Sequence, residues 1–185
     1  FLDQYQKEVK ELKKINILIA GKTGVGKSTL VNAVFRENLA QTGVGVPVTQ
    51  NLNKISKEGI PLVIYDTKGL ELSQESQEEV RRAILEEISK PERKNNPDEL
   101  MHICWYCVNA LSNRIEPYEI EWIRDLAGQM PLVLVLTQSL GNQYRELFYA
   151  IEDLNLPISA LVPVLAKPYK LSQDLVLDPR GLQEL

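Results

Sequence analysis

Residues 21–28 read Gly-Lys-Thr-Gly-Val-Gly-Lys-Ser and match the pattern G-x-x-x-x-G-K-[ST] at every required position. The apolar stretch 15–20 precedes them and predicts a strand, and a helix is expected from about Lys27 to Arg36. In this setting the glycines let backbone N–H groups converge on a phosphate, and the helix N-terminus adds a favourable dipole. The stretch therefore predicts a phosphate site.

The residues of this loop have separate expected roles. The candidate phosphate-binding residues are Gly21, Lys22, Thr23, Gly24, Val25, Gly26, Lys27, Ser28 and Thr29. Lys27 is expected to reach the phosphate oxygens as a point charge, and the Ser28 hydroxyl to ligate Mg²⁺. The apolar run 60–66 predicts a strand that ends in Asp66, whose carboxylate is the second candidate Mg²⁺ ligand.

Two further positions are candidates for contact with a terminal phosphate. Asp66 opens a D-x-x-G pattern that ends at Gly69, where a glycine lets a backbone N–H approach the γ-phosphate. Thr49 belongs to a long loop, residues 41–50, and could close over Mg²⁺ when triphosphate is present. Thr42 is the alternative in that loop, but Thr49 is favoured because it abuts the next strand.

Strand-like and helix-like runs alternate, which predicts an α/β domain with helices on both faces of a mostly parallel sheet. The runs 51–56 and 60–65 flank Lys57-Glu58-Gly59 and predict a hairpin, so one edge strand should be antiparallel. Further strands are expected at 101–109, 131–137 and 158–165, and helices at 76–90, 117–127 and 141–154. A lead-in helix is expected at 1–14, before a domain at 15–185. Both ends are expected to be cuts in a longer chain. Residues 180–185 are expected to begin a truncated helix.

Composition excludes several classes. The chain has 185 residues and a net charge of −4, whereas nucleic-acid binding usually makes a domain basic, so no nucleic acid is predicted as a partner. No apolar run approaches the length of about 20 residues that a bilayer requires, so no membrane segment is expected. Cys104 and Cys107 invite a metal or redox interpretation, but strand residues three apart point to opposite faces. Buried thiols in a reducing cytoplasm are favoured, and the expected location is cytoplasmic.

Together, the phosphate loop and the run Asp-Thr-Lys-Gly-Leu at 66–70 resemble the small G-domain GTPases, and more closely their Era and septin branch. The stretch 101–108, continuing to 119–123, is similar to the septin sequence between the fourth strand and the third helix. The resemblance spans roughly residues 15–167. It implies a three-layer P-loop NTPase G domain with a six-stranded, mostly parallel sheet and one antiparallel edge strand.

The resemblance also implies an activity. GTP and GDP would be substrate and product, Mg²⁺ the cofactor, and Thr49 and Gly69 would hold two loops against the γ-phosphate until hydrolysis releases them. The family's base-reading motif [NT]-K-x-D falls at residues 137–140, Thr-Gln-Ser-Leu, and its S-A-K loop is partly matched at 165–167, Leu-Ala-Lys. The candidate base-binding residues are Thr137, Gln138, Ala166 and Lys167. The Ala166 N–H would donate to the guanine O6, but Leu140 replaces the base-reading aspartate, which leaves guanine specificity open.

Three functions remain as alternatives. The first is a GTP-hydrolysing switch, slow because Leu70 stands where Ras-like members carry the water-orienting glutamine; a homodimer across the nucleotide face could supply the missing group. The second is a septin-like assembly module with little or no turnover. The third is a P-loop kinase or ATPase, which would need arginines near the γ-phosphate, whereas Arg81, Arg82 and Arg93 are expected to face solvent. The effector protein cannot be named from the sequence.

Overall fold

The computed structural model describes residues 14–36, 46–67, 74–112, 114–170, 172 and 175–185. The strands are β1 (Ile15–Ala20), β2 (Val46–Thr49), β3 (Leu52–Ser56), β4 (Leu62–Thr67), β5 (Ile103–Asn109), β6 (Leu132–Thr137), β7 (Ala160–Pro163), β8 (Tyr169–Lys170) and β9 (Val176–Leu177). The helices are α2 (Lys27–Phe35), α3 (Gln74–Ile88), α4 (Pro91–Lys94), α5 (Pro117–Ala127) and α6 (Arg145–Asp153), with 3₁₀ turns η1 (Ala110–Ser112) and η2 (Leu182–Glu184).

Within these ranges the main sheet has seven strands, in the order β2-β3-β4-β1-β5-β6-β7. Neighbouring strands from β4 to β7 run parallel, and Ile17 at the centre of β1 lies opposite Ile64 and Ile103. Strands β3 and β4 form the expected antiparallel hairpin. Chain order reverses at β1, and in such sheets ligands bind outside the carboxyl ends of the strands at this point.

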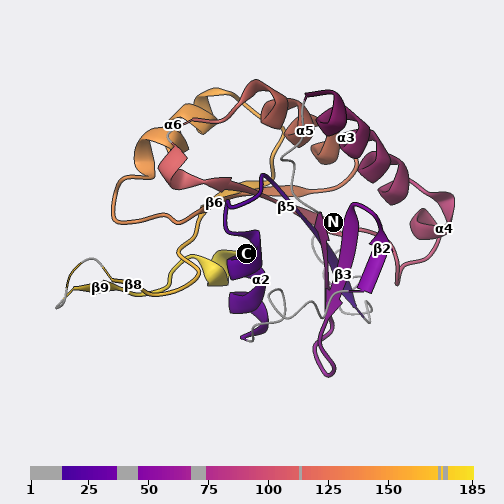
Figure 1. Ribbon diagram of the computed structural model, residues 1–185, viewed down its shortest axis with the longest axis horizontal. Coiled ribbons are helices and arrows are strands. Elements are labelled where there is room, and N and C mark those ends of the chain that lie inside the picture. The colour runs from indigo at the N-terminus through magenta and orange to yellow at the C-terminus, as the bar shows by residue number, and fades with distance from the viewer. Residues whose placement is uncertain (1–13, 37–45, 68–73, 113, 171, 173–174) are drawn as a thin grey trace, which may run out of the picture.

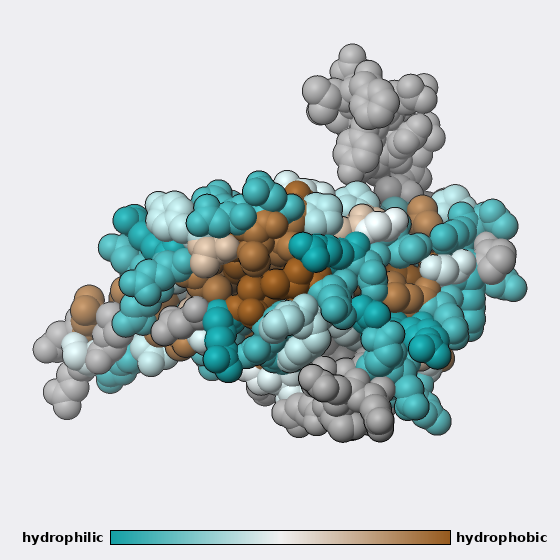
Figure 2. Space-filling view, turned by 90° about the horizontal axis from the view of Figure 1, so that it is seen from above, coloured by the Kyte–Doolittle hydropathy of each residue, from teal (hydrophilic) through white to brown (hydrophobic). Residues whose placement is uncertain are grey.

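The sheet separates two apolar cores, which gives the three predicted layers (Figure 1). Alternation along β1 decides the sides: Leu18 faces the helices α3, α5 and α6, whereas Ile17 and Ile19 face α2. The buried anchors of the first layer include Ile84, Trp122 and Ile151, and those of α2 include Leu30 and Phe35. Seen from the side of α3, α5 and α6, apolar side chains occupy the middle of the face between hydrophilic borders (Figure 2).

The sheet differs from the prediction of six strands at its edge. Residues 46–49, expected to be loop, form β2 and pair antiparallel with β3. Pro47 is compatible with this strand, because an edge strand tolerates proline where one side of its backbone needs no partner. The predicted edge strand is thus second from the edge, and Thr49 lies in a strand.

Several predicted elements are shorter or different. The helix expected at 141–154 begins at Arg145 after a turn, and the strand expected at 158–165 spans Ala160–Pro163. The segment expected to begin a last helix forms the 3₁₀ turn η2, preceded by the hairpin β8–β9, which the sequence did not predict. The predicted helix at 1–14 lies outside the described residues apart from its last residue.

The structure shows where the two cysteines lie and whether any described helix could span a membrane. Cys104 and Cys107 are buried free thiols in β5, one in each core, as the strand alternation predicts. Burial raises the pKa of Cys107 to about 12, so this thiol stays protonated. Among the described residues, no group of three or more acidic, histidine and cysteine side chains is arranged to hold a metal ion, and no helix is long and apolar enough to cross a bilayer.

Candidate functional site

The loop after β1 lies in close contact with the neighbouring strand β5. Gly21 has a φ of +130°, and a Cβ there would lie 2.3 Å from the carbonyl oxygen of Cys107 in β5. Such an approach admits only glycine. The loop then turns into α2 through Gly26, whose φ is +104°. The backbone therefore wraps at the carboxyl end of β1, as the sequence pattern predicts.

Thr137, at the end of β6, holds this loop in place. Its buried hydroxyl donates to the carbonyl of Val25 and lies 3.1 Å from the carbonyl oxygen of Val108 in β5. Gly26 lies beside Thr137, where an added Cβ would make an ordinary 3.5 Å contact with the Thr137 Cβ, so its positive φ rather than lack of space favours glycine there. Thr137, predicted as a base-binding residue, thus ties the phosphate loop to two strand ends and also lines the neighbouring cavity.

A cavity of about 320 Å³ opens over the loop. It is lined by Thr23, Gly24, Gly26, Lys27, Ser28, Thr29, Asp66 and Thr67. Lys27 is buried, and its ammonium donates to the carbonyl oxygens of Gly21 at 2.8 Å and Lys22 at 2.9 Å. The lysine thus lies across the loop in which the predicted phosphate would sit.

Two buried oxygens face no partner at the β4 end of this cavity. Among the described residues, Asp66 Oδ1 and Thr67 Oγ1 accept or donate no hydrogen bond. Burial raises the pKa of Asp66 to about 6, although the positive charge of Lys27 acts in the opposite direction. A buried carboxylate without a partner is costly, so the site favours a cation or a proton beside Asp66.

A second cavity of about 260 Å³ adjoins the first and shares Gly24, Gly26 and Thr29 with it. The first is called the phosphate cavity and the second the base cavity, after the residues predicted for each. The other lining residues of the base cavity are Thr137, Gln138, Leu140, Leu165, Ala166, Lys167 and Tyr169. All four predicted base-binding residues are therefore brought together. The Ala166 N–H makes no hydrogen bond within the described part of the chain, so it remains available to a ligand.

Gln138 and Leu140 form one wall of the base cavity, and its backbone is conformationally restrained. Gln138 has a φ of +54°, a left-handed conformation that costs a non-glycine residue about 1 kcal/mol or more. Leu140 is buried and lines the cavity, and no carboxylate is among the lining residues that the structure describes. Asn142, a candidate substitute acceptor, is exposed and does not line the cavity.

The family model described as "50S ribosome-binding GTPase" matches residues 16–138. The chain belongs to this GTPase family. The match runs from β1 to Gln138, so it includes the phosphate loop, Asp66 and the first half of the base cavity.

Several curated relatives of this chain are septins. Human Septin-12 is 28% identical over 170 residues, which cover 77% of this chain and 48% of that protein. Zebrafish (Danio rerio) neuronal-specific septin-3 is 24% identical over 147 residues, covering 67% of this chain and 41% of that protein. The chain therefore spans about half the length of the curated relatives that it matches.

Solved structures share the fold of this GTPase. A probable GTP-binding protein engB superposes with a TM-score of 0.58 at 20% identity, covering 82% of this chain and 89% of that one. Translation elongation factor SelB from Methanococcus maripaludis, solved with the GTP analogue GppNHp, gives a TM-score of 0.54 at 17% identity, covering 84% of this chain and 30% of that one. At these identities the likeness shows the G-domain fold.

Not every predicted phosphate-loop side chain of this GTPase faces the cavity. Val25 is buried in the core, and its contribution to the loop is its backbone. Lys22 points toward α5, where its ammonium lies 2.9 Å from Glu119 Oε2 and 5.0 Å from the Tyr118 ring centroid. Burial lowers the pKa of Lys22, but hydrogen bonds and charges from Glu119 and Tyr118 outweigh it and raise the pKa overall. Lys22 therefore links the loop to α5.

The predicted γ-phosphate contacts are not assembled in this structure. Thr49 ends β2, where its hydroxyl accepts from the Asn51 N–H at 3.2 Å, and it does not line the phosphate cavity. Leu52 pairs with both Thr49 and Thr67, so two strand spacings, about 10 Å, separate Thr49 from the cavity wall. Gly69, Leu70 and Thr42 lie outside the described residues, and the roles of Thr49 and Gly69 stay predictions.

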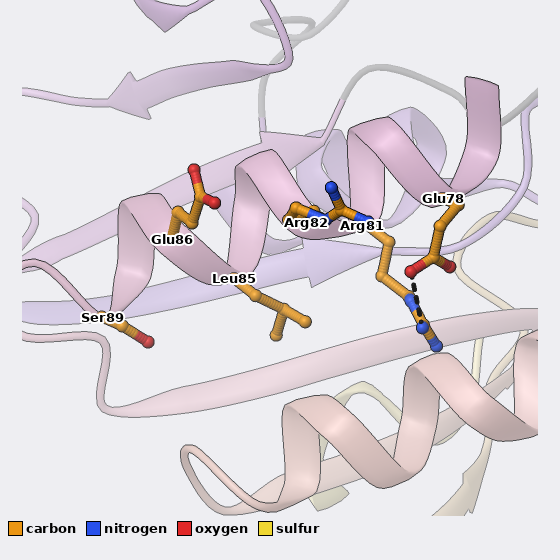
Figure 3. Close-up of a pocket in the computed structure, with 6 residues that line it drawn as sticks. All are labelled: Glu78, Arg81, Arg82, Leu85, Glu86 and Ser89. Atoms are coloured by element: carbon orange, nitrogen blue, oxygen red, sulfur yellow. Dashed lines mark hydrogen bonds and ion pairs between the residues drawn. The ribbon is translucent and has the colours of Figure 1, made fainter. Parts of the chain in front are cut away.

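The three arginines considered for a kinase lid lie on the α3 side. Arg81 contacts Glu78 at 2.9 Å and Asp125 at 3.1 Å beside a surface groove of about 300 Å³ along α3 (Figure 3). Arg82 is exposed, as predicted. Arg93, predicted to face solvent, is buried: it donates to Glu87 at 3.0 Å and covers the Tyr65 ring. None of the three lines the phosphate cavity.

Sequence reasoning missed three residues at the site of this GTPase. Thr67 lines the phosphate cavity, Tyr169 lines the base cavity, and Arg180 binds the loops around the base cavity. Thr67 lies inside the D-x-x-G pattern, so that pattern could have identified it. No motif marks Tyr169 or Arg180, because both reach the site only through the hairpin β8–β9 and the strand ends that it joins.

Proposed function

We infer that this chain binds a guanine nucleotide together with Mg²⁺ and works as a molecular switch that hydrolyses GTP slowly. The observation that carries this inference is the continuity of the two cavities, which share three residues of the phosphate loop. At one end the Asp66 Oδ1 has no hydrogen-bond partner within the described residues, and at the other end the Ala166 N–H is available as a backbone donor. A nucleotide has its phosphates and base at the matching ends.

The donor set fits Mg²⁺. Asp66 and Ser28 line the same cavity, and both supply the oxygen ligands that this cation prefers. The unpartnered Asp66 oxygen supports the assignment, because a divalent cation would satisfy it. When bound, Mg²⁺ would neutralise phosphate charge and orient the phosphate oxygens.

The chain's own groups then bind and orient the phosphates. The loop offers its backbone N–H groups, and the Lys27 ammonium would exchange the carbonyls of Gly21 and Lys22 for phosphate oxygens. Thr137 would hold the loop against the end of β5 during this exchange, because its hydroxyl contacts the carbonyl oxygens of Val25 and Val108.

A septin-like assembly module with little turnover is the second candidate. The curated relatives named as septins favour it. In this case a second copy would meet the chain across the nucleotide face, and an effector protein would read the assembled state. Both candidates require the same nucleotide site.

Thermal unfolding with and without ligand tests the site. GDP with Mg²⁺ at about 100 times its dissociation constant should stabilise the fold by roughly 2.7 kcal/mol. For a domain of this size the melting temperature should rise by about 5 to 11 °C. Lys27→Ala should remove most of this rise, whereas Lys14→Ala, which changes an exposed lysine at the other end of β1, should retain it.

A Lys27→Ala variant that retained the full rise in melting temperature would contradict the phosphate-site assignment. Loss of the rise in both variants would point instead to a general charge effect. ATP in place of GDP separates a guanine site from an ATP-binding site, because equal stabilisation by both would remove the guanine preference.

A further inference from the structure

Arg180 joins two loops that border the base cavity. Its guanidinium donates to the carbonyl oxygens of Ser139 at 2.8 Å and Gly141 at 2.7 Å, and it stacks over the Tyr144 ring at 5.3 Å. Its backbone N–H and carbonyl pair with those of Leu165, both at 3.0 Å. One residue thus contacts the loop after β6 through its side chain and the loop after β7 through its backbone.

The contacted residues are next to the cavity wall. Ser139 and Gly141 flank Leu140, and Leu165 precedes Ala166; Leu140, Leu165 and Ala166 all line the base cavity. The positions of Leu140 and of the Ala166 N–H therefore depend on the two segments that Arg180 holds together.

The loop after β6 needs such a restraint. Gln138 and Gly141 both have positive φ angles, of +54° and +50°. A Cβ added at Gly141 would meet nothing within 4 Å, so packing does not fix the backbone at Gly141 itself, whereas Ser139 and Leu140 are buried. Hydrogen bonds restrain the loop further: the Ser139 N–H donates to the Val164 carbonyl at 3.1 Å and its hydroxyl to the Leu136 carbonyl at 2.7 Å, and Arg180 adds the bonds to Ser139 and Gly141.

Arg180 is itself fixed by the chain that follows it. Gly181 has a φ of +80°, and a Cβ there would lie 2.2 Å from the carbonyl oxygen of Pro163 at the end of β7. The backbone therefore passes directly against β7 and presents Arg180 to the loop after β6. The phosphate cavity has none of these residues in its lining.

We propose that Arg180 is the positioning residue of the base cavity, which it builds by holding the loop after β6 against the loop after β7. This inference rests on the proposed function and deepens it. The affinity for the base then depends on Arg180, whereas the affinity for the phosphates does not. The ligand class is a purine nucleotide whose base is held by shape and by backbone donors, since no carboxylate reads it among the described lining residues.

The test compares ligands with and without a base. Arg180→Met removes the donors but keeps much of the apolar stem, and it should weaken Mg²⁺–GDP binding about five- to tenfold, as expected for losing net hydrogen bonds. Inorganic tripolyphosphate with Mg²⁺ has no base, and its affinity should change by less than about twofold. Arg145→Met is the matched control, because Arg145 is exposed on α6 and its side chain makes no hydrogen bond, ion pair or ring contact within the described residues; both affinities should be unchanged.

Arg180→Lys adds a second measurement. It keeps the positive charge, but it replaces the planar group that lies over Tyr144 and reaches both carbonyls, so GDP affinity should fall between the wild type and Arg180→Met. Unfolding without ligand checks that each variant is folded. A purely structural role would lower the affinities for GDP and tripolyphosphate together and would overturn the proposal.

The remaining outcomes are also decisive. Unchanged GDP affinity in a folded Arg180→Met variant overturns the role of Arg180 while leaving the proposed function intact. Failure of the wild-type chain to bind GDP overturns both, and it is distinguishable because it appears before any substitution is made.

Discussion

Asp66 is the residue whose protonation the structure makes most sensitive to the ligand. Its pKa is raised by burial from 3.8 to about 6, and its Oδ1 lacks a hydrogen-bond partner within the described residues. A raised carboxyl pKa means that the folded chain binds a proton more tightly than the unfolded chain. The stabilisation that this proton gives is complete below about pH 4 and is lost as the pH rises through about 6.

The affinity for Mg²⁺–GDP should therefore increase with pH between 5 and 7. Below about pH 6 the cation must displace a proton from Asp66, which weakens binding by up to about tenfold per pH unit. Asp66→Asn should bind Mg²⁺–GDP weakly and remove this part of the pH dependence. Titration of affinity against pH, with and without EDTA, checks it. Asp98→Asn changes an exposed carboxylate and serves as the control; an unchanged slope in Asp66→Asn would show that another group titrates.

The loop after β6 carries the question of base selectivity. Leu140 lines the cavity where the family's aspartate would accept from the guanine 2-amino group, so inosine should lose little there. ITP should bind within about tenfold of GTP, or roughly 1.4 kcal/mol, whereas ATP should bind more weakly because its amino group faces the Ala166 N–H. Competitive displacement by the three nucleotides measures this order.

Leu140→Asn keeps the branched side chain of four heavy atoms and supplies a neutral oxygen acceptor at this position. It should increase the preference for GTP over ITP while leaving the order of GTP and ATP unchanged. If wild-type ITP binds a hundredfold or more weakly than GTP, another acceptor, such as a backbone carbonyl or Asn142, reads the 2-amino group.

Much of the site follows from contiguous sequence. The phosphate loop is fixed by residues that are neighbours in the chain, so its pattern predicted the position of Lys27. The base cavity was predicted in part, since Gln138 and Ala166 each follow an apolar strand. Arg180 could not be predicted, because its partners lie in other loops and no periodicity records them. The sequence did not predict that residues 46–49 form an edge strand or that Arg93 forms a buried ion pair with Glu87. Local propensity does not reveal the tertiary partner in either case.

At the scale of the whole molecule, the strand order places the phosphate cavity at the carboxyl-end edge of the sheet, next to the central strand β1. Asp66 is the single carboxylate among the described lining residues, and we assign it to Mg²⁺. The described lining includes no glutamine or histidine that could orient an attacking water. Hydrolysis by a single copy should therefore be slow, on the order of 10⁻⁴ to 10⁻² per second.

A second copy that meets this edge would change that rate, because it could supply the group that orients water or exclude solvent from the phosphates. Single-turnover hydrolysis of GTP should then accelerate as the protein concentration rises through the range in which dimers form, measured in parallel by sedimentation. The rate constant of a Lys27→Ala chain should stay low at every concentration, which controls for a contaminating hydrolase. A rate that stays slow and independent of concentration while dimers form would favour the assembly module. Fast hydrolysis by the dilute monomer would instead show that one chain contains a complete catalytic site, and the dimer would then be unnecessary for turnover.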